Sequence, residues 1–496
     1  MVPYKNEHSV WFVVGSQHLY GQETLKKVEE NATEIAVFFN QTLSVPVNIV
    51  LKSIITTAES VREVCQSAMA DKSCIGMIFW MHTFSPAQMW ITGLSILKKP
   101  FLHLHTQYNL DIPWKVIDMD FMNLNQSAHG DREFGFICSR MGLNRAVVVG
   151  HWKDKQVIRE IEDWSRAAIG WNESKNLRIA RFGDNMRDVA VTEGDKVAGR
   201  IKFGWTVAGY GVGELVAIVK AVSEIDCHRR MEEYNETYKM DALFKKDESR
   251  RQKLIEAARI EIGLEQFLEN GNFKAFTTTF EDLHGLKQLP GLSVQRLMAK
   301  GYGFGAEGDW KTAALIRCMK VMTKDLSGGT SFMEDYTYHL NSSGMKVLGA
   351  HMLEICPSIA SGTPTLEVHP LSIGGKDDPA RLVFSAKEGD ALNASLIDLG
   401  DRFRLIVNTV KAVKPENLPK LPVARALWIP NPDLKVAAHA WILAGGAHHT
   451  GFSYDVKPEH LRHFAEMAGI EFLLIDENSQ IEEFKKEIRW NNRIFS

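Results

Sequence analysis

Continuous apolar runs alternate with amphipathic segments from residue 9 to about residue 150. The apolar runs cover residues 10–14, 47–51, 76–80, 101–105 and 146–149. Segments of helical length and period, such as 22–39 and 87–98, separate most of them. Strands that are apolar throughout and alternate with helices are typical of a parallel sheet buried on both faces. The pattern predicts a doubly wound α/β domain, in which ligands bind beyond the carboxyl ends of the strands.

The pattern changes twice further along the chain. A second α/β unit is predicted by β-like runs at 177–182 and 275–280, a charge-rich helical stretch over about 223–271 and a helix at 310–324. After Gly328 and Gly329, short β-like runs with Gly and Pro turns predict a mainly antiparallel domain. These runs are 346–348, 365–368, 381–384, 394–398 and 403–410, and helices are expected near 458–469 and 480–490. The expected fold is therefore α/β: two doubly wound parallel-sheet domains (1–175 and 176–328), followed by a mainly antiparallel β domain with C-terminal helices (329–496).

Composition excludes several classes of protein. The 496 residues include 58 Lys and Arg against 61 Asp and Glu, a net charge of −3, whereas nucleic-acid binding needs clustered basic residues. No apolar stretch is long enough to span a bilayer, and the first residues lack a secretion-signal pattern. The six cysteines are scattered and form no C-x-x-C pair, which fits a reducing compartment. We expect a cytoplasmic protein with neither nucleic acid nor membrane as a partner.

One motif suggests a nucleotide site. Gly303, Gly305 and Gly308 match G-x-G-x-x-G, and Asp325 follows about 20 residues later. The motif cradles a pyrophosphate only when it follows a strand, whereas the preceding residues 293–301 are predicted to be helical. We therefore interpret the glycines as close turns that could hold the Glu307 carboxylate in a cleft.

Two acidic segments flank the predicted domain junction. Glu307 lies just before Asp309, a good N-cap for the helix that begins near Trp310, so both carboxylates could simply be favourable charges at a helix start. After the junction come Glu334 and Asp335. They lie among Phe332, Tyr336, Tyr338 and His339, which indicate a buried or half-buried wall rather than an exposed acidic turn.

Histidines supply the other candidate ligands. His351 lies in an apolar strand-like run, where a lone histidine is more often a hydrogen-bonded core residue than a ligand. His448 and His449 follow a Gly-Gly pair in a small-residue segment, which is a better ligand signal. Adjacent side chains on an extended backbone point apart, so at most one of the pair is expected to bind directly.

Together, Glu307, Glu334, His351 and one of the paired histidines make a set of two carboxylates and two imidazoles. Such a set suits Mn²⁺, with Co²⁺ or Mg²⁺ as possible substitutes. The large sequence separations exclude a single-helix motif, so only the tertiary fold could bring the four groups together.

Ten segments along almost the whole chain resemble the L-arabinose isomerase family. They are FVVGSQHLYG (12–21), WMHTFSP (80–86), HLHTQYN (103–109), NQSAHGDRE (125–133), RFGDNMR (181–187), GAEGDWKTA (305–313), TSFMEDYTYH (330–339), GAHMLE (349–354), IGGKDDP (373–379) and WILAGGAHHT (441–450). The resemblance implies an intramolecular oxidoreductase that converts L-arabinose to L-ribulose, with D-galactose to D-tagatose as a side reaction.

The resemblance also implies roles for individual residues. The metal ligands would be Glu307, Glu334, His351 and His449, and the two glutamates would also act as the acid/base pair. The substrate-binding residues would be Gln17, Phe84, His129, Met186, Phe280 and Ile373. The family's active site is assembled in a homohexamer, so Gln17 and His129 would come from a neighbouring subunit.

The implied chemistry is proton transfer between C2 and C1 of an open-chain sugar through a cis-enediol. We assign Glu307 to the proton at C2 and Glu334 to the oxygen end. Three alternatives remain open: an L-fucose isomerase-like enzyme, a nicotinamide-dependent sugar oxidoreductase built on residues 303–308, and a non-catalytic sugar-binding α/β protein.

Overall fold

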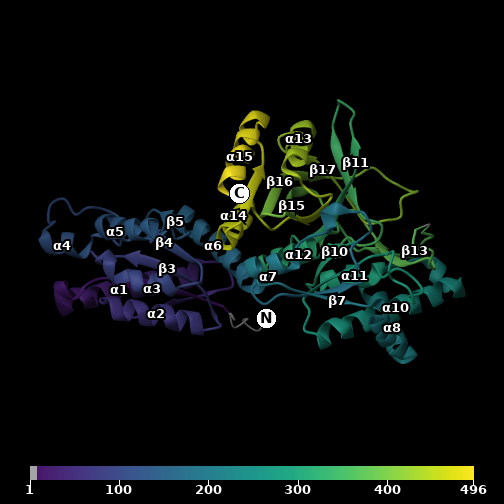
Figure 1. The fold of residues 1–496 in the computed structure, drawn as a ribbon, viewed down its shortest axis with the longest axis horizontal. Helices are drawn as coiled ribbons and strands as arrows, with labels where there is room; N and C mark the ends of the chain where they lie inside the picture. The colour runs from purple at the N-terminus through teal and green to yellow at the C-terminus, as the bar shows by residue number, and fades with distance from the viewer. Residues whose placement is uncertain (1–7, 372, 496) are drawn as a thin grey trace. The chain divides into compact units, whose positions relative to one another are not determined.

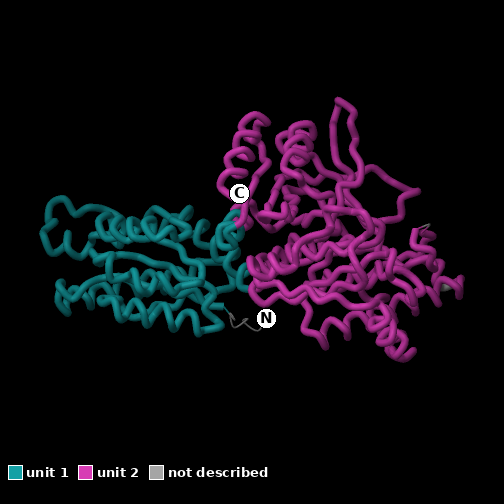
Figure 2. The backbone as a smooth tube through the Cα atoms, viewed as in Figure 1, with its two compact units in different colours: residues 1–172, 462–469 teal, residues 173–461, 470–496 magenta. Residues whose placement is uncertain are grey.

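The computed structural model describes residues 8–371 and 373–495. Within it the chain divides into two compact units (Figure 2). The first contains residues 1–172 and 462–469, and the second contains residues 173–461 and 470–496. Figure 1 shows the order of the helices and strands in each unit. None of the helices in these described ranges has both the length and the apolar character needed to cross a membrane.

The first unit is built on a five-stranded parallel sheet of order β2-β1-β3-β4-β5. Its strands are β1 (Ser9–Gly15), β2 (Asn48–Leu51), β3 (Cys74–Met81), β4 (Phe101–His105) and β5 (Ala146–Val149). Its helices are α1 (Gly21–Thr42), α2 (Ala58–Ala70), α3 (Ile91–Ile96), α4 (Met119–Leu124), α5 (Ser127–Arg140) and α6 (Lys155–Ser174). Every residue of β1 and β3 is buried, which is why both read as continuous apolar runs.

Helices cover both faces of this sheet, which confirms the doubly wound architecture. On one face, Trp11 and Phe79 share a core with residues of α2, α3 and α5. On the other, Phe12 packs edge-on against Phe39 of α1, with ring centroids 6.3 Å apart.

The second unit begins with a four-stranded parallel sheet of order β10-β9-β6-β7. Its strands are β6 (Arg178–Phe182), β7 (Thr206–Tyr210), β9 (Ala275–Thr278) and β10 (Gly303–Ala306). The helices of this region are α7 (Lys196–Phe203), α8 (Val212–Ala221), α9 (Glu224–Thr237), α10 (Glu248–Asn270), α11 (Gly291–Ala299) and α12 (Trp310–Met322). The helix predicted at 293–301 and the helix at 310–324 are therefore both present.

The glycine-rich segment is a strand, so its interpretation as a series of close turns is wrong for Gly303 and Gly305. Both lie in β10, and a Cβ on them would meet the backbone oxygens of Ala313 and Asp309 of the following helix region at 2.1 and 2.2 Å. These glycines allow α12 to pack directly on the strand. The α12 backbone fills the space beside them, which disfavours a pyrophosphate cradle. Only Gly308, with φ +83°, makes a turn.

The C-terminal region is a seven-stranded, mainly antiparallel sheet of order β15-β18-β11-β12-β17-β16-β19. Its strands are β11 (Thr330–His339), β12 (Lys346–Ala350), β15 (Gly389–Asp398), β16 (Phe403–Val413), β17 (Arg425–Pro430), β18 (His449–Ser453) and β19 (Glu471–Ile475). β15 also pairs with β16, so the sheet closes on itself, and β19 joins β16 in parallel. The helices α13 (Leu434–Ala444), α14 (Pro458–Ala468) and α15 (Ile481–Ile494) follow, and β8 (Lys239–Met240), β13 (Thr365–Val368) and β14 (Ala380–Val383) form a small separate sheet.

The wall predicted around Glu334 is only partly present. Phe332 is fully buried, but Tyr336 and Tyr338 are 52% and 44% exposed, and His339 is also exposed. These three residues lie on the outer half of β11, beyond a register shift in its pairing with β12. The strand is buried where it pairs with β18, over residues 330–333, and it becomes exposed where it pairs with β12 alone. The aromatic composition did not reveal this difference.

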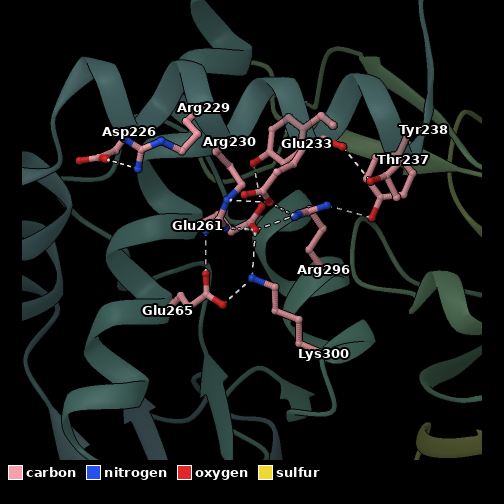
Figure 3. Close-up of polar contacts among 11 residues, drawn as sticks. Asp226, Arg229, Arg230, Glu233, Thr237, Tyr238, Glu261, Glu265, Arg296 and Lys300 are labelled. Carbon is pink, nitrogen blue, oxygen red and sulfur yellow. Dashed lines mark hydrogen bonds and ion pairs between the residues drawn. The ribbon is translucent and has the colours of Figure 1, made fainter. Parts of the chain in front are cut away.

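A buried ion network joins α9, α10 and α11 (Figure 3). Glu261 is completely buried and accepts hydrogen bonds from Arg230, from Arg296 Nε at 2.8 Å and from the Tyr234 hydroxyl at 2.7 Å. Glu265 extends the network to Arg230 at 2.9 Å and to Lys300. Because its charges are paired and hydrogen-bonded, the network can lie inside this helical layer.

Candidate metal centre

Three neighbouring strands of the C-terminal sheet bring polar side chains side by side. Glu334 on β11 lies opposite His449 on β18 and opposite Ala350 on β12, the residue before His351. Directly opposed residues of antiparallel strands point to the same face, so Glu334 and His449 share one face of the sheet. Pairing between strands far apart in sequence therefore assembles this half of the site.

Glu307 reaches the site from the central parallel sheet. It lies in the turn between β10 and α12, with φ +60°. A non-glycine residue in the left-handed region is uncommon and stores backbone strain of about 1–3 kcal/mol, a feature that clusters at functional sites. The turn is tied down by hydrogen bonds from Gly308 N to Thr278 O at 3.3 Å and from Met186 N to Glu307 O at 3.0 Å.

Helix α12 connects the two halves. It packs on β9 and β10 and also on β11, β15 and β18. Asp309 is its N-cap and accepts from Thr312 N at 3.1 Å, as expected from the sequence. The same side chain contacts His449: Asp309 Oδ2 is 3.3 Å from His449 Nδ1.

The predicted ligands converge. One ligand atom each from Glu307, His351 and His449 lie within 4.8 Å of one another, and His351 Nε2 is 3.8 Å from Glu334 Oε2. His449 Nε2 lies 3.8 Å from Glu307 Oε2 and is buried without a hydrogen-bond partner. A buried imidazole nitrogen with no partner, facing carboxylates, fits a divalent cation of the Mn²⁺ type. Of the adjacent histidines, His449 rather than His448 belongs to this group.

Burial and the neighbouring charges perturb the acidity of these groups. Burial raises the pKa of Glu307 and of Glu334 above the ordinary value, with opposition from His351. Burial lowers the pKa of His449 to about 4, so its imidazole is neutral at pH 7. For His351, burial lowers the pKa, but the carboxylates of Glu354, Glu334 and Glu307 outweigh it and the net shift is upward. A cation here would favour the ionised carboxylates and the neutral imidazoles.

Two carboxylates behind the histidines were not predicted to have a role in the site. Glu354 Oε2 is 2.5 Å from His351 Nδ1, and Asp309 takes the equivalent place behind His449. Both residues lie within the segments used for the resemblance, but Asp309 was interpreted only as a helix cap. Hydrogen bonds from a loop to a strand end cannot be predicted from periodicity, so no separate signal marks these two carboxylates in the sequence.

Two of the three expected substrate-binding residues of the second unit lie on adjoining loops. Met186 donates its backbone N–H to Glu307 O, which places its loop beside the candidate metal centre. Arg187 joins this loop to the one that follows Phe280, through ion pairs with Glu281 and Asp282 at 2.8 and 2.7 Å. Ile373 is half-buried on another loop.

The other expected residues belong to the first unit. Gln17 and Phe84 follow β1 and β3, at the carboxyl edge of the parallel sheet. The Phe84 ring lies against the exposed His129 ring of α5, with centroids 4.5 Å apart. A 2.7 Å hydrogen bond from Thr83 to Ser16 connects the loops that carry Phe84 and Gln17. The three residues thus gather where ligands bind in such sheets.

Comparison with protein families gives three consecutive matches. Residues 4–176 match the L-arabinose isomerase N-terminal domain, residues 178–325 the central domain and residues 329–471 the C-terminal domain.

Individual relatives are similar over nearly their whole length. The chain is 60% identical to the L-arabinose isomerase of Herpetosiphon aurantiacus over 98% of this chain and 97% of the relative. It is 62% identical to that of Geobacillus stearothermophilus and 58% identical to that of Yersinia pestis, with the same coverage. Among solved structures, the glucose-galactose binding protein GanP of G. stearothermophilus aligns with 64% of this chain and 92% of its own chain. The sequence identity is 12% and the TM-score is 0.15.

Proposed function

Because the chain belongs to the L-arabinose isomerase family, we propose that it converts L-arabinose to L-ribulose, with D-galactose to D-tagatose as a side reaction. The observation that carries the proposal is the convergence of Glu307, Glu334, His351 and His449, together with the unpartnered Nε2 of His449. A sugar-binding protein without catalysis has no need for two half-buried carboxylates with raised pKa values.

Glu307, Glu334, His351 and His449 would hold a divalent cation, Mn²⁺ or its substitutes Co²⁺ and Mg²⁺. When bound, the cation supplies Lewis-acid stabilisation for negative charge that develops on the sugar oxygens. His449 is suited to this set because its neutral form, favoured by burial, leaves Nε2 as an electron-pair donor.

The two glutamates would carry the protons. Glu307 would remove the proton from C2 of the open-chain aldose, and Glu334 would serve the oxygen end, giving a cis-enediol. Return of the proton to C1, with the roles exchanged, gives the ketose. The strained turn at Glu307 holds its carboxylate in one place, so little reorganisation is needed during the reaction.

The proposal predicts a strict need for metal and a preference among sugars. After thorough chelation, the enzyme should lose activity towards L-arabinose and regain it on addition of Mn²⁺. In a parallel assay of L-arabinose, D-galactose and L-fucose, L-arabinose should be turned over fastest. Activity that survives metal removal would refute the metal-dependent mechanism, and faster turnover of L-fucose would favour the L-fucose isomerase-like alternative.

We also propose a homo-oligomer, a hexamer, in which Gln17 and His129 serve the active site of a neighbouring subunit. Exposed apolar side chains support it: between residues 110 and 122, Leu110, Trp114 and Val116 are each at least 74% exposed in the single chain. Such a group of side chains marks a surface that another protein covers. The free cysteines at positions 65, 74, 138, 227, 318 and 356 are all buried, which supports the cytoplasm as the compartment.

Sharing of the active site predicts complementation between two inactive variants. Co-expressed Glu307→Gln and His129→Ala subunits should form mixed oligomers in which roughly one site in four combines two intact halves, if the subunits pair at random. Each variant alone should be nearly inactive. If sites were confined to one subunit, every site would carry one defect and mixing would restore nothing. Wild-type activity of His129→Ala alone would contradict the role of His129.

A further inference from the structure

Each site histidine points one ring nitrogen inward and the other towards a second carboxylate. His351 Nε2 is 3.8 Å from Glu334, while its Nδ1 is 2.5 Å from Glu354 Oε2. His449 repeats the arrangement, with Nε2 at 3.8 Å from Glu307 and Nδ1 at 3.3 Å from Asp309 Oδ2. Two carboxylate–imidazole pairs from different parts of the fold therefore have the same orientation.

This arrangement determines which nitrogen carries the hydrogen. An ionised carboxylate only accepts hydrogen bonds, so the nitrogen that faces it must donate. Nδ1–H therefore points outward, and the electron pair of Nε2 points into the site. A neutral imidazole in the opposite tautomer would present an N–H to the cation and could not bind it.

We propose that Glu354 is a positioning residue for metal binding: it holds His351 in the Nδ1–H tautomer and in the orientation that aims Nε2 at the cation. Asp309 does the same for His449. The inference rests on the proposed metal-dependent function. It adds two positioning residues, which do not themselves bind the cation, to the four expected ligands. Metal-ligating histidines in proteins are commonly oriented by such a carboxylate.

The surroundings of Glu354 fit a positioning role better than a structural one. It lies in no helix or strand, and its other hydrogen bond is a short-range one from Leu353 N to the same oxygen, at 2.9 Å. The His351 ring is already packed edge-on against Phe332, with centroids 5.1 Å apart. Packing thus places the ring in the core, but a hydrocarbon ring cannot distinguish the two imidazole nitrogens, whereas Glu354 can.

Asp309 is less suitable for a first test because it has several roles. It caps α12 and lies 3.5 Å from the buried ammonium of Lys311. Its replacement would destabilise the helix and leave the Lys311 ammonium with backbone carbonyls but without its carboxylate, so weaker metal binding could have either cause. Replacement of Glu354 avoids this ambiguity, because Glu354 does not lie in a helix or cap α12.

The test is Mn²⁺ binding to the metal-free full-length enzyme, measured by electron paramagnetic resonance of free Mn²⁺. Glu354→Gln keeps the volume of the side chain but removes its charge, and its amide can present either a donor or an acceptor to Nδ1. We expect its Mn²⁺ affinity to fall by about 10- to 100-fold relative to wild type. The control is Glu367→Gln, since Glu367 makes an equivalent 2.5 Å contact with His369 Nε2 but neither is a proposed ligand.

The outcomes separate this inference from the function on which it rests. Equal Mn²⁺ affinity of Glu354→Gln and wild type would overturn the positioning role and leave the proposed function intact. Failure of the wild type to bind Mn²⁺ would overturn both. If Glu354→Gln does not fold, ¹⁵N NMR of histidine-labelled, metal-free wild type at alkaline pH decides, with the His351 signal assigned by its loss in His351→Gln: protonated Nδ1 supports the inference and protonated Nε2 overturns it.

Discussion

Glu334→Gln and Glu307→Gln should each lower kcat for L-arabinose by roughly 10²–10⁴-fold, the range that general acid–base catalysis contributes. A glutamine keeps the size of the side chain and an oxygen that can face a cation, but it cannot take up and return a proton at pH 7. Because both residues are also proposed ligands, kcat must be measured at a Mn²⁺ concentration that saturates each variant. Under these conditions the remaining loss reports proton transfer rather than metal occupancy.

Glu256→Gln is a matched control in the same unit. Its side chain is 14% exposed and its ion-pair partners are Arg259 and Lys287, neither of which is a proposed site residue. This variant should keep wild-type kcat. If Glu307→Gln or Glu334→Gln kept near-normal kcat at saturating Mn²⁺, that glutamate would not be the acid or base. Comparison of the two variants in deuterium exchange at C2 also tests which one removes the proton: Glu307→Gln should abolish the exchange.

The first domain was predictable because its inner strands, such as β1 and β3, are buried on both faces. β1 and β3 are unbroken apolar runs, so composition alone marks them as strands. β10 was missed because two of its four residues are glycines, which have low strand propensity and suggest a turn. The structure explains why glycine is needed at these two positions: α12, the next helix in the chain, lies so close to the strand that no Cβ would fit. Hydrophobic periodicity does not reveal such a close approach.

Closure of the C-terminal sheet was beyond prediction for a related reason. The runs at 394–398 and 403–410 identify parts of β15 and β16, but nothing in them indicates that β15 pairs with β18 on its other edge. On the opposite edge of β18, its pairing with β11 sets Glu334 opposite His449. The ligand types could therefore be named from residue chemistry, and His449 chosen through the resemblance, while their convergence depends on long-range pairing.

Glu261→Gln should be among the most destabilising single replacements in the second unit, with a loss of about 3–5 kcal/mol in the free energy of unfolding. Glu261 is completely buried, and the side chains of Arg230 and Arg296 are only 14% and 8% exposed. A neutral amide would leave excess positive charge in a region that water cannot reach. Urea denaturation followed by tryptophan fluorescence measures the effect.

The surface pair Glu482–Lys485 provides the control, because Glu482→Gln removes a solvent-exposed carboxylate and should leave the urea midpoint unchanged. A second comparison isolates the cause. In Glu261→Leu/Arg296→Met the buried guanidinium of Arg296 is removed along with its buried partner Glu261, and Arg230 keeps Glu265 at 2.9 Å. The double variant should therefore be more stable than Glu261→Gln. If it is less stable instead, the network contributes through its hydrogen bonds and packing, and the cost of an unpaired buried charge is not the dominant effect.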